Sequence, residues 1–146
     1  MVGSVSALEA TGSWQGLVRR ALLSAACLVA ASTAGLAQSF LPNAVWTNQN
    51  GSTLTIKQIA PNGSFTGLYV SHGSGSCQGD AFPAIGWIDG QKISFIVHWA
   101  NAKENCESIT SWTGYLERRG VLLRWNRVEF GITGNTMMRS GTQLFR

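Results

Sequence analysis

The sequence predicts an all-β fold, an eight-stranded antiparallel up-and-down β-barrel. Three observations predict it: alternating polar and apolar segments recur about every 8–12 residues, turn signals separate them, and no helical period follows residue 37. The composition agrees, with 17 glycines and 6 tryptophans among 146 residues, because glycine marks tight turns and aromatic residues favour strands. Eight sequential antiparallel strands close most simply as a barrel, which removes exposed sheet edges.

Residues 1–37 differ in character from the rest and are typical of a secretory signal peptide. Arg19 and Arg20 precede an apolar, small-residue run over residues 21–34. Small residues then occupy the −3 and −1 positions of a cleavage site after Ala37. A short core helix is the alternative, but no partner helix follows. We therefore expect a secreted protein, extracellular or periplasmic.

The mature domain, residues 38–146, is mildly basic. The leader removes two basic residues and one acidic residue, which lowers the formal net charge from +4 to +3. A nucleic-acid partner needs a stripe of basic side chains. Arg118-Arg119 is the one basic cluster of the mature domain, and we interpret it as a solvated turn. An outer-membrane barrel is disfavoured because Lys57 and Arg124 lie within predicted strands. We expect no nucleic-acid partner and no membrane association after signal cleavage.

Two cysteines, Cys77 and Cys106, remain once Cys27 leaves with the leader. An even number of cysteines in an exported chain favours a disulfide. A metal site is not expected, because two cysteines with His72 and His98 lack ligand spacing. No nucleophile, base or carboxylate pair stands at a suggestive spacing either, so no catalytic residue is expected and the chain is not predicted to be an enzyme.

The first three predicted strands follow from alternation and turn signals. Trp46–Asn48 begins the series, and Thr53–Lys57 alternates polar and apolar residues as a half-buried strand does. The turn signal Pro61-Asn62-Gly63 leads into a strand over Phe65–Ser71. The Gly/Ser-rich stretch 72–79 then predicts a loop that contains Cys77.

The second half of the chain predicts five more strands with the same period. Asp89-Gly90 is a strong hairpin signal, the polar segment 101–107 predicts a loop, and Arg119-Gly120 predicts a turn. The strands that these signals bound are Phe82–Ile88, Lys92–Ala100, Ser108–Glu117, Val121–Val128 and Thr142–Phe145.

Alternation also predicts which polar and aromatic side chains share a face. Ser108, Thr110 and Trp112 point the same way, as do Tyr69 and Ser71. Four tryptophans lie on separate predicted strands, namely Trp87, Trp99, Trp112 and Trp125. They could simply fill the core, but an indole N–H needs a partner when buried. Several inward tryptophans beside Ser, Thr and Tyr therefore favour an aromatic pocket with fixed hydrogen-bonding groups.

Three motifs together resemble the successive signatures of the avidin and streptavidin family. They are Trp46–Ser52 (WTNQNGS), Phe65–Ser71 (FTGLYVS) and Ser108–Gly114 (SITSWTG). The resemblance runs from about residue 45 to the C-terminus, and it rests on the order and spacing of the motifs. It implies a barrel that binds biotin at high affinity in its mouth, as a ligand and not as a cofactor.

The resemblance assigns hydrogen-bonding roles toward the ureido group of biotin. Asn48, Ser52 and Tyr69 would donate to the ureido oxygen, and Ser71 would accept from a ureido N–H. Relatives carry Asp or Asn on the last strand to accept from the second N–H. Gln143 stands at that position here, and it can still accept although it is longer and neutral.

The remaining residues that the resemblance assigns surround the rings and tail of biotin. Trp99, Trp112 and Trp125 would line the bicyclic ring and the valeryl chain. Thr110 would face the sulfur atom, and Ser108 would lie near the tail carboxylate.

Two features resemble the dimeric, rhizavidin-like branch of the family. Tetrameric relatives supply a tryptophan to the neighbouring pocket, but Asn135 stands in that slot and residues 132–140 contain no tryptophan. Cys77 and Cys106 would join two rim loops instead, so a homodimer is expected. The alternative function is an exported barrel that carries another small hydrophobic ligand, which the Gln143 replacement would favour.

Overall fold

Eight strands and no helix make up the part of the chain that this computed structural model describes, residues 39–131 and 133–146. The predicted signal peptide lies outside the described residues. No segment of the described chain is a helix able to cross a membrane. The strands are β1 (Val45–Thr47), β2 (Thr53–Ile59), β3 (Ser64–Val70), β4 (Ala81–Asp89), β5 (Lys92–Trp99), β6 (Ser108–Glu117), β7 (Gly120–Phe130) and β8 (Thr136–Phe145).

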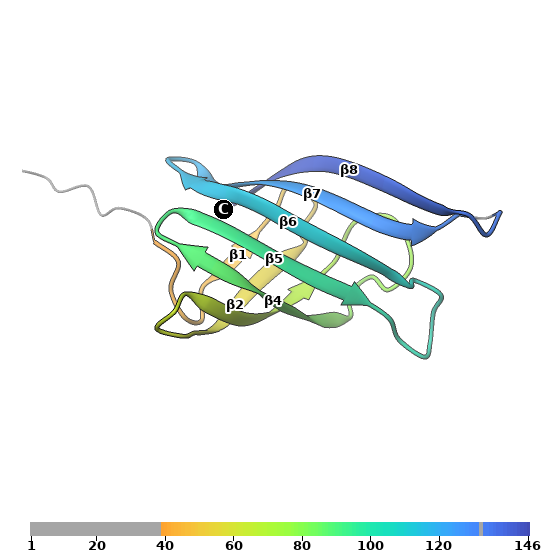
Figure 1. The fold of residues 1–146 in the computed structure, drawn as a ribbon, viewed down its shortest axis with the longest axis horizontal. Coiled ribbons are helices and arrows are strands. Elements are labelled where there is room, and N and C mark those ends of the chain that lie inside the picture. The colour runs from red at the N-terminus through yellow and green to blue at the C-terminus, as the bar shows by residue number, and fades with distance from the viewer. Residues whose placement is uncertain (1–38, 132) are drawn as a thin grey trace, which may run out of the picture. The chain divides into compact units, whose positions relative to one another are not determined.

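Each strand pairs antiparallel with the next one along the chain, which gives one sheet in the order β1 to β8 (Figure 1). The sheet curls until its two edge strands meet. Thr47 and Arg146 exchange two backbone hydrogen bonds of 2.8 Å, and Asn48 bridges to Phe145. This closure confirms the predicted eight-stranded up-and-down barrel.

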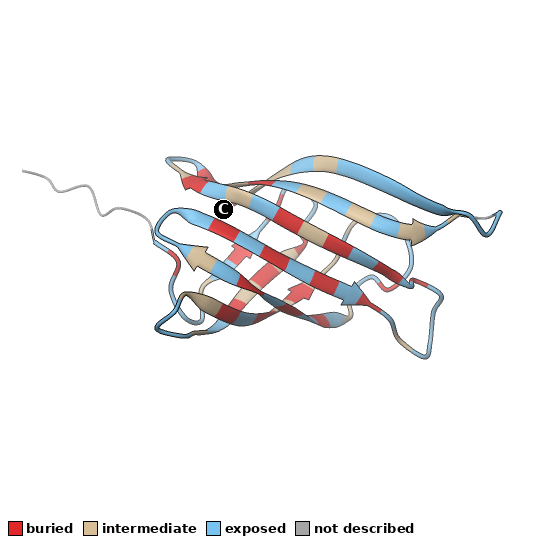
Figure 2. Cartoon of the chain, in the orientation of Figure 1, coloured by how far each residue is buried: buried red, intermediate tan, exposed pale blue. Residues whose placement is uncertain are grey.

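The alternation of burial along the strands separates an inner from an outer face (Figure 2). In β5 every second residue, from Ile93 to Trp99, is buried and the residues between them are exposed. Side chains that alternate in this way point to opposite sides of a sheet. His98 is therefore on the outer face and Trp99 on the inner face, as expected.

The two ends of the barrel differ in their connections. Short turns join β2 to β3, β4 to β5 and β6 to β7 at one end. The loops 48–52, 71–80 and 100–107 gather at the opposite end with the connection between β7 and β8 (Figure 1). We call this second end the mouth. The tight hairpin predicted at Asp89-Gly90 is present, because Asp89 pairs directly with Lys92.

Two expectations from the sequence are wrong. Strand β8 begins at Thr136 and not at Thr142, since its first residues pair with β7 although most of their side chains are exposed. Polar and apolar residues do not alternate in this segment, because backbone hydrogen bonds to β7, and not the burial of side chains, hold it in the sheet. Trp87 is 63% exposed and faces outward. In β4 the buried residues are Phe82, Ala84 and Gly86, and Trp87 lies one position out of step with them.

Candidate functional site

Asn48 directly follows β1 at the mouth, where its side chain accepts hydrogen bonds from the β1–β2 turn. Its Oδ1 accepts from the backbone N–H groups of Asn50 and Ser52, both at 2.9 Å. These bonds fix the orientation of the amide, so that Nδ2 points away from the turn. Nδ2 is buried and has no hydrogen-bond partner among the described residues. A buried donor without a partner is costly, so this group is poised to donate to a ligand.

Ser52 and Tyr69 lie beside Asn48 on the inner face and are both buried. The Ser52 oxygen accepts from the backbone N–H of His72 at 2.9 Å. The Ser52 hydroxyl also forms a side-chain hydrogen bond with the Tyr69 hydroxyl. Asn48, Ser52 and Tyr69, which the resemblance assigned to one ureido oxygen, thus bring the free Nδ2 of Asn48 and two hydroxyl groups to one region.

The aromatic side chains of the site pack against one another in the middle of the barrel. Tyr69 lies 4.7 Å from Trp112 and 5.6 Å from Trp99, measured between ring centroids. Phe95 stacks on Trp112 with ring centroids 4.8 Å apart and an interplanar angle of 9°, and its centroid lies 6.2 Å from that of Tyr69. The structure thus brings Tyr69, Trp99 and Trp112 together, and it adds Phe95, which was not predicted as a site residue.

The two buried indoles find polar partners that were also predicted site residues. The Nε1 of Trp99 donates to the Thr110 hydroxyl at 2.8 Å. The Nε1 of Trp112 donates to Gln143 Oε1 at 3.3 Å. Each hydrogen bond fixes the orientation of one indole ring. The hydroxyl proton of Thr110 and the second lone pair of Gln143 Oε1 remain available for further hydrogen bonds.

Trp125 sits apart from this cluster but on the same face. It is opposite Trp112 on β6 and Gly141 on β8, and it is half-buried against the core. A Cβ at Gly141 would come within 2.8 Å of the indole ring. Glycine at this position therefore lets the indole lie flat against β8.

A pocket opens at the seam where β1 and β8 meet. Its volume is about 390 Å³, within the usual size range of small-molecule sites. Asn48 and Gln143 are the two predicted site residues among those that line it. Leu122, Thr142 and Leu144, which also line it, alternate to the outer face, and none of the predicted tryptophans does so. Ser71, at the start of the 71–80 loop, is half-buried near the mouth, and its hydroxyl oxygen accepts from Gly73 N–H at 3.4 Å.

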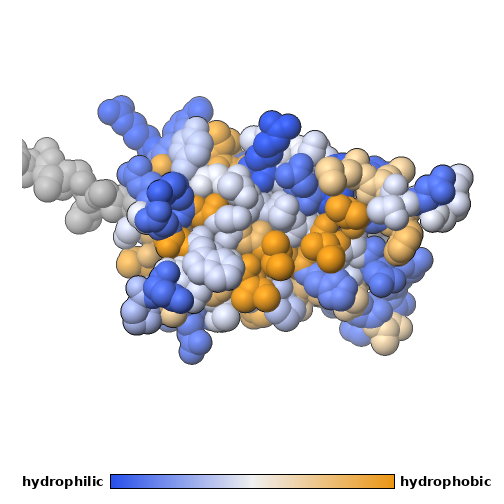
Figure 3. All heavy atoms as spheres, viewed as in Figure 1, coloured by the Kyte–Doolittle hydropathy of each residue, from blue (hydrophilic) through white to orange (hydrophobic). Residues whose placement is uncertain are grey.

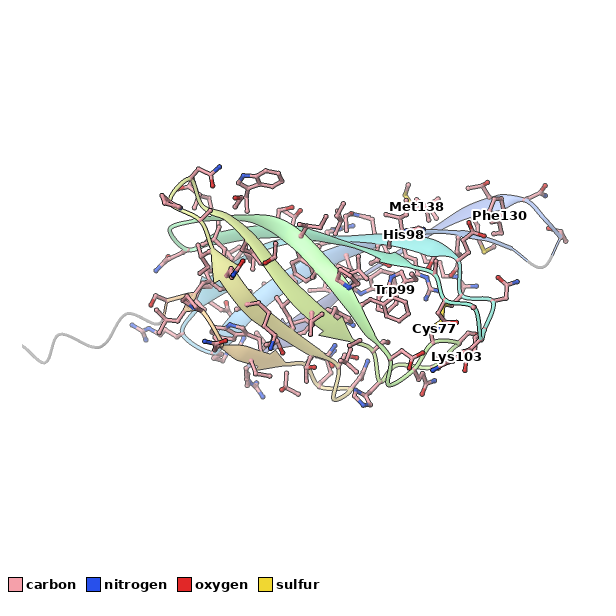
Figure 4. The ribbon with its side chains drawn as sticks, turned by 90° about the horizontal axis from the view of Figure 1, so that it is seen from below. Cys77, His98, Trp99, Lys103, Phe130 and Met138 are labelled. Carbon is pink, nitrogen blue, oxygen red and sulfur yellow. A yellow bond between two sulfur atoms is a disulfide. The ribbon has the colours of Figure 1, made fainter. Side chains whose placement is uncertain are left out.

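The disulfide predicted between Cys77 and Cys106 is present. It joins the 71–80 loop to the 100–107 loop at the mouth, and Figure 4 shows Cys77 there beside Trp99 and Lys103. Two polar contacts tie the same loops: Glu104 accepts from the Cys77 N–H, and Asn101 Nδ2 donates to Asp80 at 2.9 Å. These contacts hold the two rim loops together.

Three charged residues near Ser108 were not predicted as site residues. Arg127 and Glu129 follow Trp125 at every second position of β7, and Arg139 is opposite Arg127 on β8. Alternation from Trp125 could have found Arg127, since the predicted strand included both. Glu129 and Arg139 lie beyond the predicted strand ends and carried no signal.

Burial raises the pKa of Tyr69 from 10.0 to about 12, while the nearby Ser52 hydroxyl acts in the opposite direction. Above pH 10 the unfolded chain would ionise this phenol and the folded chain would not, so stability should fall. We expect the free energy of unfolding to drop by about 2 kcal/mol more in wild type than in Tyr69→Phe between pH 10 and 12. Denaturant unfolding at each pH measures this, with the exposed Tyr115→Phe as control. Equal pH profiles for wild type and Tyr69→Phe would contradict the burial of this group.

Comparisons with known proteins agree with this architecture. The chain is 44% identical to afifavidin of Afifella pfennigii over 86 residues, 56% of this chain and 54% of that protein. It is 37% identical to hoefavidin of Hoeflea phototrophica over 83 residues, 51% of each chain. The chain therefore spans about half the length of the curated relatives it matches.

Solved structures share the barrel. A rhizavidin–biotin complex superposes with a TM-score of 0.65 at 35% identity, covering 72% of this chain and 90% of that one. Apo shwanavidin gives 0.65 at 33% identity, covering 74% and 96%. A short afifavidin–biotin complex gives 0.62 at 39% identity, covering 69% and 84%. The avidin family model matches residues 37–122, more than half of the sequence, and the chain belongs to the avidin family.

Proposed function

We propose that this chain binds biotin at the mouth of the barrel and performs no catalysis. The observation that carries the proposal is the hydrogen-bonding state of Asn48 and Ser52. Their acceptor atoms are occupied by backbone N–H groups of the β1–β2 and β3–β4 loops. Asn48 Nδ2 is left as a buried donor without a partner among the described residues, and the Ser52 hydroxyl lies beside it, so this place fits an oxygen acceptor.

The ureido oxygen of biotin has the chemistry that such a donor set selects. Three donors on one carbonyl oxygen favour a polarised ureido group, and hydrogen bonds to a partly charged acceptor are the stronger kind. The neighbouring aromatic rings exclude water, which strengthens each bond further. Ser71 and Gln143 would accept from the two ureido N–H groups, and both keep acceptor capacity.

The tryptophans would supply the apolar part of the site. Trp112 and Trp99 are held by their hydrogen bonds to Gln143 and Thr110, so little ordering is left to occur on binding. Trp125 would cover the ring system from β7, and Thr110 would face the sulfur atom. The rhizavidin and short afifavidin structures are complexes with biotin, which supports the same ligand here.

Export from the cytoplasm would explain both the signal-peptide pattern of residues 1–37 and the disulfide between Cys77 and Cys106. We propose a secreted, extracellular or periplasmic location, because disulfides persist in oxidising compartments. A carrier of another small hydrophobic ligand is the alternative, favoured by Gln143 in place of an acidic residue. The biotin titration below separates the two functions.

Replacing Asn48 tests the donor set. Asn48→Asp keeps an oxygen to cap the turn but exchanges the free Nδ2 donor for a carboxylate oxygen, which would repel the ureido oxygen. We expect biotin affinity to fall by about 100-fold or more, measured by tryptophan fluorescence titration of the oxidised mature domain.

Asn62→Asp is the matched control, because Asn62 Oδ1 caps a turn in the same way at the other end of the barrel. It should leave affinity unchanged. A wild-type chain that does not bind biotin, or an Asn48→Asp variant of undiminished affinity with intact circular dichroism, would overturn the proposal.

We further propose that the chain forms a homodimer through its outer face. Cross-strand neighbours Ile109, Val128 and Met138 form a row with His98 across β5 to β8, and all are exposed. Hydrophobic side chains gather over the middle of this face (Figure 3). Contiguous exposed apolar surface commonly marks a protein interface, and a second copy of the chain would cover it.

Light scattering tests the dimer. The wild-type mature domain should have twice the mass of one chain, and Ile109→Glu should shift it to the monomer mass because a charge would be buried in the interface. Thr66→Glu, which places the same charge on exposed β3, should remain dimeric. A monomeric wild type would contradict the proposal.

The disulfide would take the place of the tryptophan lid that the sequence lacks at Asn135. By joining the two rim loops it keeps the pocket mouth formed without help from a neighbouring subunit. Reduction, or the double change Cys77→Ser and Cys106→Ser, should raise the rate of biotin release by roughly tenfold. A chase with excess unlabelled biotin measures the rate, and an unchanged rate after verified reduction would refute this role.

A further inference from the structure

A charged cluster lies on the inner face of β7 and β8 near the mouth, and the proposed function so far does not use it. Glu129 bridges two arginines: its Oε2 lies 2.9 Å from Arg127 Nε, and its Oε1 lies 2.6 Å from Arg139 Nε. The side chains of Arg127 and Glu129 are 32% and 16% exposed. One carboxylate shared by two guanidinium groups leaves one positive charge in excess.

Ser108 connects this cluster to the predicted biotin site. Its hydroxyl donates to the carbonyl of Cys106 at 3.0 Å and accepts from Arg127 Nε at 3.1 Å. The single proton of Ser108 is therefore already used, so this residue cannot donate to a carboxylate without losing that bond. Some other group must neutralise a ligand carboxylate that reaches this part of the mouth.

Arg127 has the donors that Ser108 lacks. Its contacts with described residues run through Nε, which leaves both terminal amino groups able to donate. The contacts to Ser108 and Glu129 hold the side chain in place, so a ligand would meet an already oriented guanidinium. A guanidinium matches a carboxylate with two parallel hydrogen bonds.

Arg127 also lies in the direction that a ligand tail would take. It follows Trp125 by two residues on the same face of β7, a rise of about 7 Å toward the mouth. It is directly opposite Thr110 on β6. A ring system held beside Trp125 and Thr110 would extend its side chain toward Arg127 and the solvent.

We propose that Arg127 binds the carboxylate of the ligand tail and makes the chain selective for free biotin over biotin whose tail is esterified or amidated. This inference rests on the proposed function of the same site. Glu129 positions the guanidinium, and Arg139 neutralises the second oxygen of Glu129 so that the cluster keeps its excess positive charge.

The test compares biotin with biotin methyl ester, which has the same rings and no tail charge. Wild type should bind biotin about tenfold more tightly than the ester. Arg127→Gln should bring this ratio close to one by weakening biotin, with the ester affinity unchanged. Arg124→Gln removes the same charge from the exposed outer face of β7 and should keep the wild-type ratio.

A second measurement on the wild type alone does not depend on how a variant folds. Raising the salt concentration should lower the biotin-to-ester ratio, because screening weakens the charged contact and leaves the neutral ligand unaffected. A wild-type ratio of one, a ratio that Arg127→Gln preserves, or an equal loss of both ligands in that variant would overturn the role of Arg127. Failure of wild type to bind either ligand would instead overturn the proposed function itself.

Discussion

Closure of the sheet between β1 and β8 is the constraint on which the site depends. Two backbone hydrogen bonds between Thr47 and Arg146 and the bridge from Asn48 to Phe145 join the ends of the sheet. Once the sheet is closed, every second side chain of eight strands shares one interior. Asn48, directly after the first strand, and Gln143, on the last strand, then line one pocket at the seam although 95 positions separate them in the sequence.

Hydrogen-bond satisfaction then decides what the interior can recognise. Backbone N–H groups occupy the acceptor atoms of Asn48 and Ser52, and the indoles of Trp99 and Trp112 donate to Thr110 and Gln143. Asn48 Nδ2 is left as a buried donor without a partner among the described residues, and Gln143 Oε1 keeps a second lone pair. A cyclic urea presents the complementary pattern, an oxygen flanked by two N–H groups, so the loops that close the strands also set the chemistry of the site.

The sequence predicted the barrel well because alternation and turn chemistry are local signals. The inward positions of Ser108, Thr110 and Trp112 follow from a period of two, which needs no knowledge of the partner strands. Alternation gives two faces but does not say which is buried, and so Trp87 was wrongly expected among inward tryptophans. The first half of β8 was not predicted because its side chains stay exposed although it pairs with β7, so the sequence shows no alternation of polar and apolar residues there. Alternation from Trp125 places Arg127 on the inner face, but its contact with Ser108, which lies 19 positions away, could not be predicted from the sequence.

A crystal structure of the oxidised mature domain grown with biotin tests the central claim most directly. We expect the ureido oxygen within hydrogen-bond distance of Asn48 Nδ2, Ser52 Oγ and Tyr69 Oη, with the bicyclic ring against the tryptophans. Biotin bound elsewhere, or in the barrel with its ureido oxygen turned away from these three donors, would contradict it.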